Sequence, residues 1–283
     1  MDETTITITT DDGTELQVYR WAPAGKPKAA VQLHHGLGEH AGRYRRFAEA
    51  ITAAGYLVYA PDQRASGRTA NGEYGNWGPD GWAGWAHDYA LVNQRIREDN
   101  PGLKVALFGH SLGSFGAQHY LLEHSADVDA VVLSGTGDVA VFAPMLASDG
   151  PAALSAFNAP FEHRTGFEWL SRDEAEVDKY VDDPACGWAA PAPAGLASLA
   201  DAADDAKLQG LTKTLPILLI SGTHDPVGGQ DGDGVETTAQ RYKDAGMEHV
   251  TVKLYPEARH EILNELNRDE VTQDVIAFLD ITL

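Results

Sequence analysis

The chain has 283 residues, 43% hydrophobic and 22% charged, a balance that excludes an intrinsically disordered protein. With 21 Lys and Arg against 42 Asp and Glu, its formal net charge is −21, so we expect no nucleic-acid partner. The single cysteine, Cys186, excludes an internal disulfide and a cysteine-based metal cluster. The polar N-terminus lacks the pattern of a secretory signal, so we expect a cytoplasmic protein. The longest aliphatic run, 217–220, is too short to span a bilayer, so we expect no stable membrane insertion.

Hydrophobic and polar residues alternate at the start of the chain. Ile6 and Ile8, a turn at 11–13, and then Leu16 and Val18 predict an antiparallel hairpin. Short apolar runs then alternate with segments of helical period. We expect strands at 29–33, 56–60 (ended by Pro61), 105–108, 130–133, 217–220 and 250–255, and helices at 44–54, 82–99, 112–124, 236–245 and after 262. Fully apolar strands separated by helices predict a doubly wound α/β fold with a mostly parallel sheet.

This alternation breaks between residues 137 and 211, a stretch rich in Ala, Pro and Gly with scattered aromatic residues. One helix start stands out, where Ser171 is placed as the N-cap and Glu174 completes a capping box. We therefore predict two core segments, 1–136 and 212–283, with a helical cap at 137–211 inserted between them.

A serine lies between a predicted strand and a predicted helix, in the sequence Gly109-His110-Ser111-Leu112-Gly113. In this context G-x-S-x-G predicts a tight turn that lifts the serine hydroxyl above the sheet. The N-terminus of the following helix offers free N–H groups and a positive dipole end to a developing negative oxygen. The motif therefore predicts acyl transfer with Ser111 as the nucleophile.

A serine nucleophile needs a base that an acid orients, and in this architecture the chain order is Ser, then Asp or Glu, then His. Asp225 follows the strand at 217–220 and His260 follows the strand at 250–255, so both belong to the sheet edge where ligands gather. His224 follows the wrong strand to be the base. Three further aspartates remain alternatives for the acid: Asp138, Asp231 and Asp233.

The loop after the strand at 29–33 is expected to supply the second oxyanion donor. It reads His34-His35-Gly36-Leu37-Gly38-Glu39-His40, and the backbone N–H of Leu37 can converge there with that of Leu112. The three histidines do not match a usual zinc spacing, so polar packing is expected, with no metal and no cofactor.

These motifs resemble those of the monoglyceride lipase and lysophospholipase-like branch of the α/β-hydrolases, of the serine aminopeptidase S33 type. The residues that carry the resemblance are His35–His40 with Gly42-Arg43-Tyr44, Gly109–Gly113, Asp225 and His260. It implies a Ser111–Asp225–His260 triad, oxyanion donors at Leu37 and Leu112, and hydrolysis of monoacylglycerols, lysophospholipids or small soluble esters in lipid metabolism. Glu39 and Arg43 would shape the polar end of the pocket, or else form a structural ion pair.

Two positions depart from the family pattern. Leu263 stands where members that cleave monoglycerides often carry a second histidine, which weakens the case for glycerol recognition. The loop that usually reads D-x-R-G-H-G is Asp62-Gln63-Arg64-Ala65-Ser66-Gly67 here, so its Gly-His pair is replaced.

Aromatic residues of the cap either line a tunnel for an acyl chain or form the cap's own core. The candidates are Phe142, Met145, Phe157, Phe161 and Trp169. The expected substrate is a small-molecule ester or a monomeric lipid, because the acidic surface repels anionic membranes. The alternatives are an acyltransferase, an aminopeptidase whose amine pocket the acidic helix at 173–183 would supply, and a non-enzymatic ligand-binding homologue. The sequence leaves the oligomeric state open.

Overall fold

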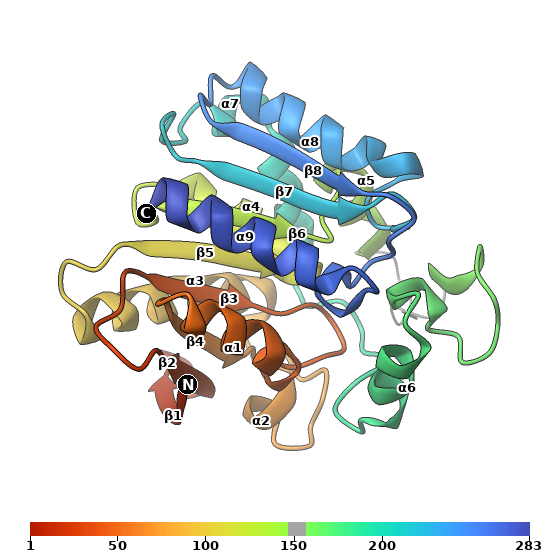
Figure 1. Cartoon of the computed structure of the whole chain (residues 1–283), viewed down its shortest axis with the longest axis horizontal. Coiled ribbons are helices and arrows are strands. Elements are labelled where there is room, and N and C mark those ends of the chain that lie inside the picture. The colour runs from red at the N-terminus through yellow and green to blue at the C-terminus, as the bar shows by residue number, and fades with distance from the viewer. Residues whose placement is uncertain (147–156) are drawn as a thin grey trace.

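The computed structural model describes residues 1–146 and 157–283. One eight-stranded sheet runs through the molecule, with helices on both faces (Figure 1). The strands are β1 (Asp2–Thr9), β2 (Glu15–Ala22), β3 (Ala30–His34), β4 (Leu57–Asp62), β5 (Val105–His110), β6 (Ala130–Ser134), β7 (Ile217–Gly222) and β8 (Val250–Tyr255). Their order in the sheet is β1-β2-β4-β3-β5-β6-β7-β8.

The pairing of these strands confirms the predicted α/β fold. β1 and β2 form the expected hairpin, β2 pairs antiparallel with β4, and every later pair is parallel. β3 lies beside β5, and β7 lies between β6 and β8. Parallel neighbours end at one edge of the sheet, so the loops after β3, β5, β7 and β8 gather at that edge.

Two hydrophobic layers enclose the sheet because successive strand residues point to opposite faces. Phe47 and Ile51 of α1 (Arg45–Ala53) and Val275 of α9 (Arg268–Thr282) cover one face, and Tyr89 of α3 (Gly81–Asp99) and Phe115 of α4 (Leu112–His124) are buried against the other. The helices of the core are η1 (Ala41–Tyr44), α1 (Arg45–Ala53), α2 (Gly67–Ala70), α3 (Gly81–Asp99), α4 (Leu112–His124), η5 (Gln230–Gly232), α8 (Asp233–Asp244), η6 (Ile262–Asn264) and α9 (Arg268–Thr282).

Two local expectations were wrong. β4 does not end before Pro61 but continues to Asp62, with Pro61 opposite Val18 of β2. By that point β3 has stopped pairing with β4, so only one neighbouring strand remains beside the proline. Ser171 is not an N-cap either, because the helix it was expected to begin starts at Glu174 and is capped by the carboxylate of Asp173.

Part of the segment between β6 and β7 lies beyond the carboxyl ends of the strands, where Figure 1 shows α6 (Glu174–Asp182), whereas α7 (Asp205–Leu208) of the same segment lies near the opposite ends of the strands, in contact with α8. The described elements of this segment are α5 (Val139–Leu146), η3 (Glu168–Leu170), α6 (Glu174–Asp182), η4 (Leu196–Ala203) and α7 (Asp205–Leu208). Residues 147–156 of the expected cap lie outside the described residues. The boundaries 137 and 211 stay a prediction, and we keep the name cap for residues 137–211. Within the described chain, every helix is too short or too polar to cross a membrane.

Candidate active site

Ser111 occupies a strained turn between β5 and α4. Its backbone angles, φ 52° and ψ −123°, lie outside the regions that L-residues ordinarily adopt. A Cβ atom on Gly109 would lie 2.4 Å from the carbonyl oxygen of Gly113, and one on Gly113 would lie 2.4 Å from that of His34. Two glycines therefore allow the turn to form tightly against β3, and the N–H of Ser111 donates to the carbonyl of Ser134 at 2.9 Å.

Asp225 and His260 are hydrogen-bonded to each other although 35 residues separate them. Nδ1 of His260 lies 2.9 and 3.0 Å from the two carboxylate oxygens of Asp225. The hydroxyl of Ser221 and the N–H of Val227 also donate to this carboxylate, each at 2.9 Å. Both members of the pair are almost fully buried. The arrangement orients the imidazole and leaves Nε2 as the ring nitrogen for the nucleophile.

Ser111 and His260 line the same cavity, which has an empty volume of about 450 Å³. Within the described residues no hydrogen bond joins the Ser111 hydroxyl to His260. Such bonds are often long in a free enzyme and tighten when substrate binds. The structure thus brings the three predicted residues to one edge of the sheet.

The alternative groups lie elsewhere. Asp138 forms an ion pair with Arg241 of α8, which occupies both of its carboxylate oxygens. Asp231, Asp233 and His224 are exposed. Of the acids considered, Asp225 alone is bonded to the imidazole of His260.

The pKa values of Asp225 and His260 are shifted in opposite directions by their surroundings. Burial alone would raise the pKa of Asp225, but the neighbouring His260 and the hydrogen bonds to its carboxylate lower that pKa below its usual value. Burial would lower the pKa of His260, but the charge and hydrogen bond of Asp225, with Glu261 and Glu39 nearby, raise it above 6.5. The pair therefore favours an ionised aspartate and a more basic imidazole.

We expect the acid limb of the pH–activity profile to have a midpoint above pH 6.5. A general base must be neutral, so kcat/KM falls as the pH drops through the raised pKa of His260. His110, whose ring centroid lies 4.8 Å from that of His260, has a pKa lowered to about 4 by burial and by His260 itself, too low to produce this limb. The measurement is kcat/KM for a soluble ester from pH 5 to 9, and a midpoint at or below 6.5 contradicts the expectation.

The two expected oxyanion donors meet at the cavity. Leu37 lies in the loop after β3, Leu112 is the first residue of α4, and both line the cavity beside Ser111. Among the described residues neither backbone N–H has a hydrogen-bond acceptor. Free donors at the positive end of a helix suit a developing negative charge.

Glu39 and Arg43 belong to a buried ion network. Arg43 donates to Glu39 at 2.7 Å and, through two nitrogens, to both carboxylate oxygens of Glu261, at 2.5 and 2.7 Å. Glu39 also accepts from the N–H of Gly36 at 2.7 Å and from the hydroxyl of Tyr44 at 2.8 Å. The two carboxylates line the cavity, whereas Arg43 lines a neighbouring one. The geometry favours an ion pair that holds the loop, because these contacts occupy the charged groups.

Three of the five apolar candidates line the cavity: Phe142, Phe157 and Trp169. Phe161 and Met145 are not among the lining residues: the guanidinium of Arg259 lies over the ring of Phe161, and Met145 is 44% exposed. Sequence reasoning missed Tyr180 and Glu261. The position of Glu261 next to His260 was a usable signal, whereas only the packing of the cap brings Tyr180 to the site.

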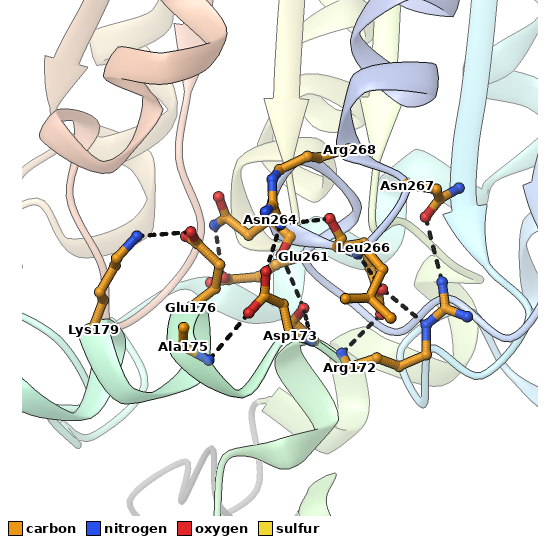
Figure 2. A network of polar contacts seen from close by, with 12 residues as sticks. Arg172, Asp173, Ala175, Glu176, Lys179, Glu261, Asn264, Leu266, Asn267 and Arg268 are labelled. Carbon is orange, nitrogen blue, oxygen red and sulfur yellow. Dashed lines mark hydrogen bonds and ion pairs between the residues drawn. The ribbon is translucent and has the colours of Figure 1, made fainter.

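The cap and the loop of His260 are joined by polar contacts (Figure 2). Glu265 is fully buried and accepts from the N–H and Nε of Arg172, at 3.0 and 2.8 Å, while Arg268 donates to Asp173 at 2.7 Å. The backbone N–H of His260 itself donates to the carbonyl of Trp169 at 3.2 Å. This part of the cap therefore helps to hold the predicted base in place.

One cluster in the described chain has metal-ligand chemistry: His40, Asp183 and Cys186, whose ligand atoms lie within 4.8 Å of one another. His40 and Asp183 are already hydrogen-bonded at 2.9 Å. Burial raises the pKa of the Cys186 thiol, which opposes the thiolate that a metal requires. The cluster lies outside the cavity of Ser111 and takes part in no step below.

The fold and the geometry of the site agree with a match to a known protein family. The sequence pattern of the serine aminopeptidase S33 family matches residues 25–267, so the chain belongs to this family of α/β-hydrolases. It is a carboxylic ester hydrolase of the monoglyceride lipase-like type.

Individual relatives cover nearly the whole chain. A monoacylglycerol lipase of Mycolicibacterium smegmatis is 29% identical over 266 residues, which are 92% of this chain and 90% of the relative. The monoglyceride lipase of Rattus norvegicus is 26% identical over 275 residues, 90% and 86% of the two chains. The crystal structure of a thermostable carboxyl esterase from Bacillus coagulans in complex with glycerol superposes with a TM-score of 0.87 at 28% identity, covering 100% of this chain and 99% of that one.

Proposed function

We propose that this hydrolase cleaves carboxylic esters through an acyl-enzyme, with Ser111, His260 and Asp225 as its triad. The observation that carries the proposal is the buried Asp225–His260 pair beside a strained serine turn at one cavity. His260 Nε2 takes the proton of the Ser111 hydroxyl as its oxygen attacks the ester carbonyl. The N–H groups of Leu37 and Leu112 stabilise the tetrahedral oxyanion.

Collapse of this intermediate breaks the carbon–oxygen bond to the alcohol, which leaves with the proton from His260. Water then attacks the acyl-enzyme, His260 takes the water's proton, and release of the acid returns that proton to Ser111. Asp225 stays ionised throughout and stabilises the imidazolium, in agreement with the lowered pKa of its carboxyl.

The proposed substrate is a small soluble ester or a monomeric lipid such as a monoacylglycerol or lysophospholipid. The aromatic and aliphatic lining of the cavity suits an acyl chain. At the position of the family's second histidine, Leu263 is buried beside Arg43 and offers no hydrogen bond to a glycerol hydroxyl. We therefore place simple esters before monoacylglycerols in the order of expected activity.

The acidic helix at 173–183 does not support an aminopeptidase activity. Asp173 is paired with Arg268, Glu176 is paired with Arg46, and Asp183 is bonded to His40. None of these carboxylates lines the cavity of Ser111. The amine pocket that the helix was expected to supply is therefore not formed by these residues.

Probe labelling and a substrate panel test the proposal together. We expect a fluorophosphonate to label the chain once, at Ser111, because only an activated serine attacks phosphorus readily. p-Nitrophenyl esters of increasing chain length and monoacylglycerols should be hydrolysed faster than aminoacyl p-nitroanilides. Mass spectrometry locates the label and absorbance follows turnover. Absence of labelling would support a binding protein, and faster anilide turnover an aminopeptidase.

A further inference from the structure

The peptide group between Gly36 and Leu37 is fixed from one side by a histidine. Nδ1 of His35 lies 2.8 Å from the carbonyl oxygen of Gly36. The peptide bonds of the described chain are trans, so the N–H of Leu37 points away from that carbonyl on the opposite side of the same plane. The imidazole of His35 therefore controls the direction of the N–H that we assign to the oxyanion hole.

The hydrogen bonds of His35 determine which ring nitrogen carries the proton. The backbone N–H of Gln63 donates to Nε2 of His35 at 3.0 Å, and a backbone N–H can only donate. Nε2 must therefore be unprotonated, and the single proton of the neutral ring lies on Nδ1, facing Gly36. His35 is fully buried, and burial lowers its pKa, in agreement with a neutral ring.

The surroundings keep this ring from reorienting. The side-chain amide of Gln63 donates to the backbone carbonyl of His35 at 2.6 Å, and its carbonyl oxygen lies 3.3 Å from Nδ1 of His34. Gly36 itself packs against the nucleophile, since a Cβ added there would lie 3.0 Å from that of Ser111. A rotation of the Gly36–Leu37 peptide would thus occur directly beside the reacting atoms.

We propose that His35 is a positioning residue, which aims the Leu37 N–H at the oxyanion through its hydrogen bond to the Gly36 carbonyl. The proposal rests on the proposed function, because it assumes that Ser111 forms a tetrahedral intermediate. A donor fixed before the reaction stabilises charge without reorganisation. The bond from His35 also polarises the peptide and makes its N–H a stronger donor.

Two substitutions of His35 separate its two hydrogen bonds. In His35→Asn the amide nitrogen can replace Nδ1 and keep the bond to Gly36, but it cannot reach Gln63. In His35→Gln the amide oxygen can replace Nε2 and accept from Gln63, but no donor faces Gly36. A merely structural histidine would tolerate either change about equally, whereas a positioning histidine would tolerate only the asparagine.

We expect His35→Gln to lower kcat about 10- to 100-fold with KM unchanged, since loss of a whole oxyanion donor costs about 10²- to 10³-fold. The inhibition constant of an ester-shaped trifluoromethyl ketone, whose adduct carries an oxyanion, should rise by the same factor. His35→Asn should remain close to wild type in both measurements. Equal kcat values for two folded variants, or a loss confined to KM, would overturn the proposal.

The wild-type enzyme supplies a measurement that does not require either variant to fold. In ¹⁵N-histidine spectra, His35 should stay in the Nδ1–H form from pH 5 to 9, and an Nε2–H tautomer or a titration in that range would contradict us. Failure of the underlying function looks different: the ketone would then leave the wild-type enzyme uninhibited, whatever residue stands at position 35.

Discussion

Ser111→Ala is expected to lower kcat for p-nitrophenyl esters about 10⁶-fold, because no other group can form the acyl-enzyme. Residual turnover over the uncatalysed reaction should persist, since the oxyanion donors and the cavity remain. The fold should survive, as the turn depends on Gly109 and Gly113 and on the backbone bond of residue 111 to Ser134. The measurement is burst and steady-state kinetics with thermal unfolding as the check on folding.

The matched control is Ser198→Ala. Ser198 is an exposed serine in η4, and among residues 1–146 and 157–283 its hydroxyl bonds only to the carbonyl of Gly195, so wild-type kcat is expected. Turnover by folded Ser111→Ala within tenfold of wild type would remove the nucleophile assignment.

Asp225→Asn should lower kcat about 10⁴-fold while KM changes little. An asparagine keeps the shape of the side chain but presents an amide N–H₂ or a neutral oxygen to Nδ1 of His260. The N–H of Val227 can only donate, so the amide oxygen takes the place of Oδ1, and the amide nitrogen takes the place of Oδ2, which lies 3.0 Å from Nδ1 of His260 and where the hydroxyl of Ser221 can turn to accept. The ring would then carry its proton on Nε2, where it cannot accept one from Ser111.

Asp138→Asn is the control for this variant, because Asp138 also follows a strand of the sheet but pairs with Arg241. It should retain wild-type kcat, with at most a modest loss of stability from the partly buried ion pair. A large loss in Asp138→Asn and a small one in Asp225→Asn would reverse the assignment of the acid.

Sequence reasoning succeeded where local pattern and chain order carry the information. The apolar strands, their order and the positions of Asp225 and His260 just after β7 and β8 follow from periodicity and from the geometry of parallel sheets. The fold class could be predicted for the same reason. The pairing of Asp225 rather than Asp138 with the imidazole required coordinates, because both aspartates follow strands.

Features set by long-range packing could not be predicted. Tyr180 reaches the cavity, and its hydroxyl donates to the carbonyl of Gly38 at 2.9 Å, across 142 residues of chain. Met145 was placed in the cavity on composition alone, although its position along α5 exposes it. The hydroxyl of Ser171 donates to the carbonyl of Asn264 and accepts from the N–H of Asp173, so it lies one step before the cap, and Asp173 caps the helix instead.

The contacts between the cap and the loop of His260 limit how the enzyme can admit its substrate. An outward swing of α6 as a rigid body would break the bonds from Arg172 to Glu265 and from Arg268 to Asp173, and it would pull on the backbone that carries the imidazole. Wide opening on this side would thus switch catalysis off. Substrates are therefore expected to enter the cavity on a side away from these contacts. The size of that entrance should limit which esters reach the triad.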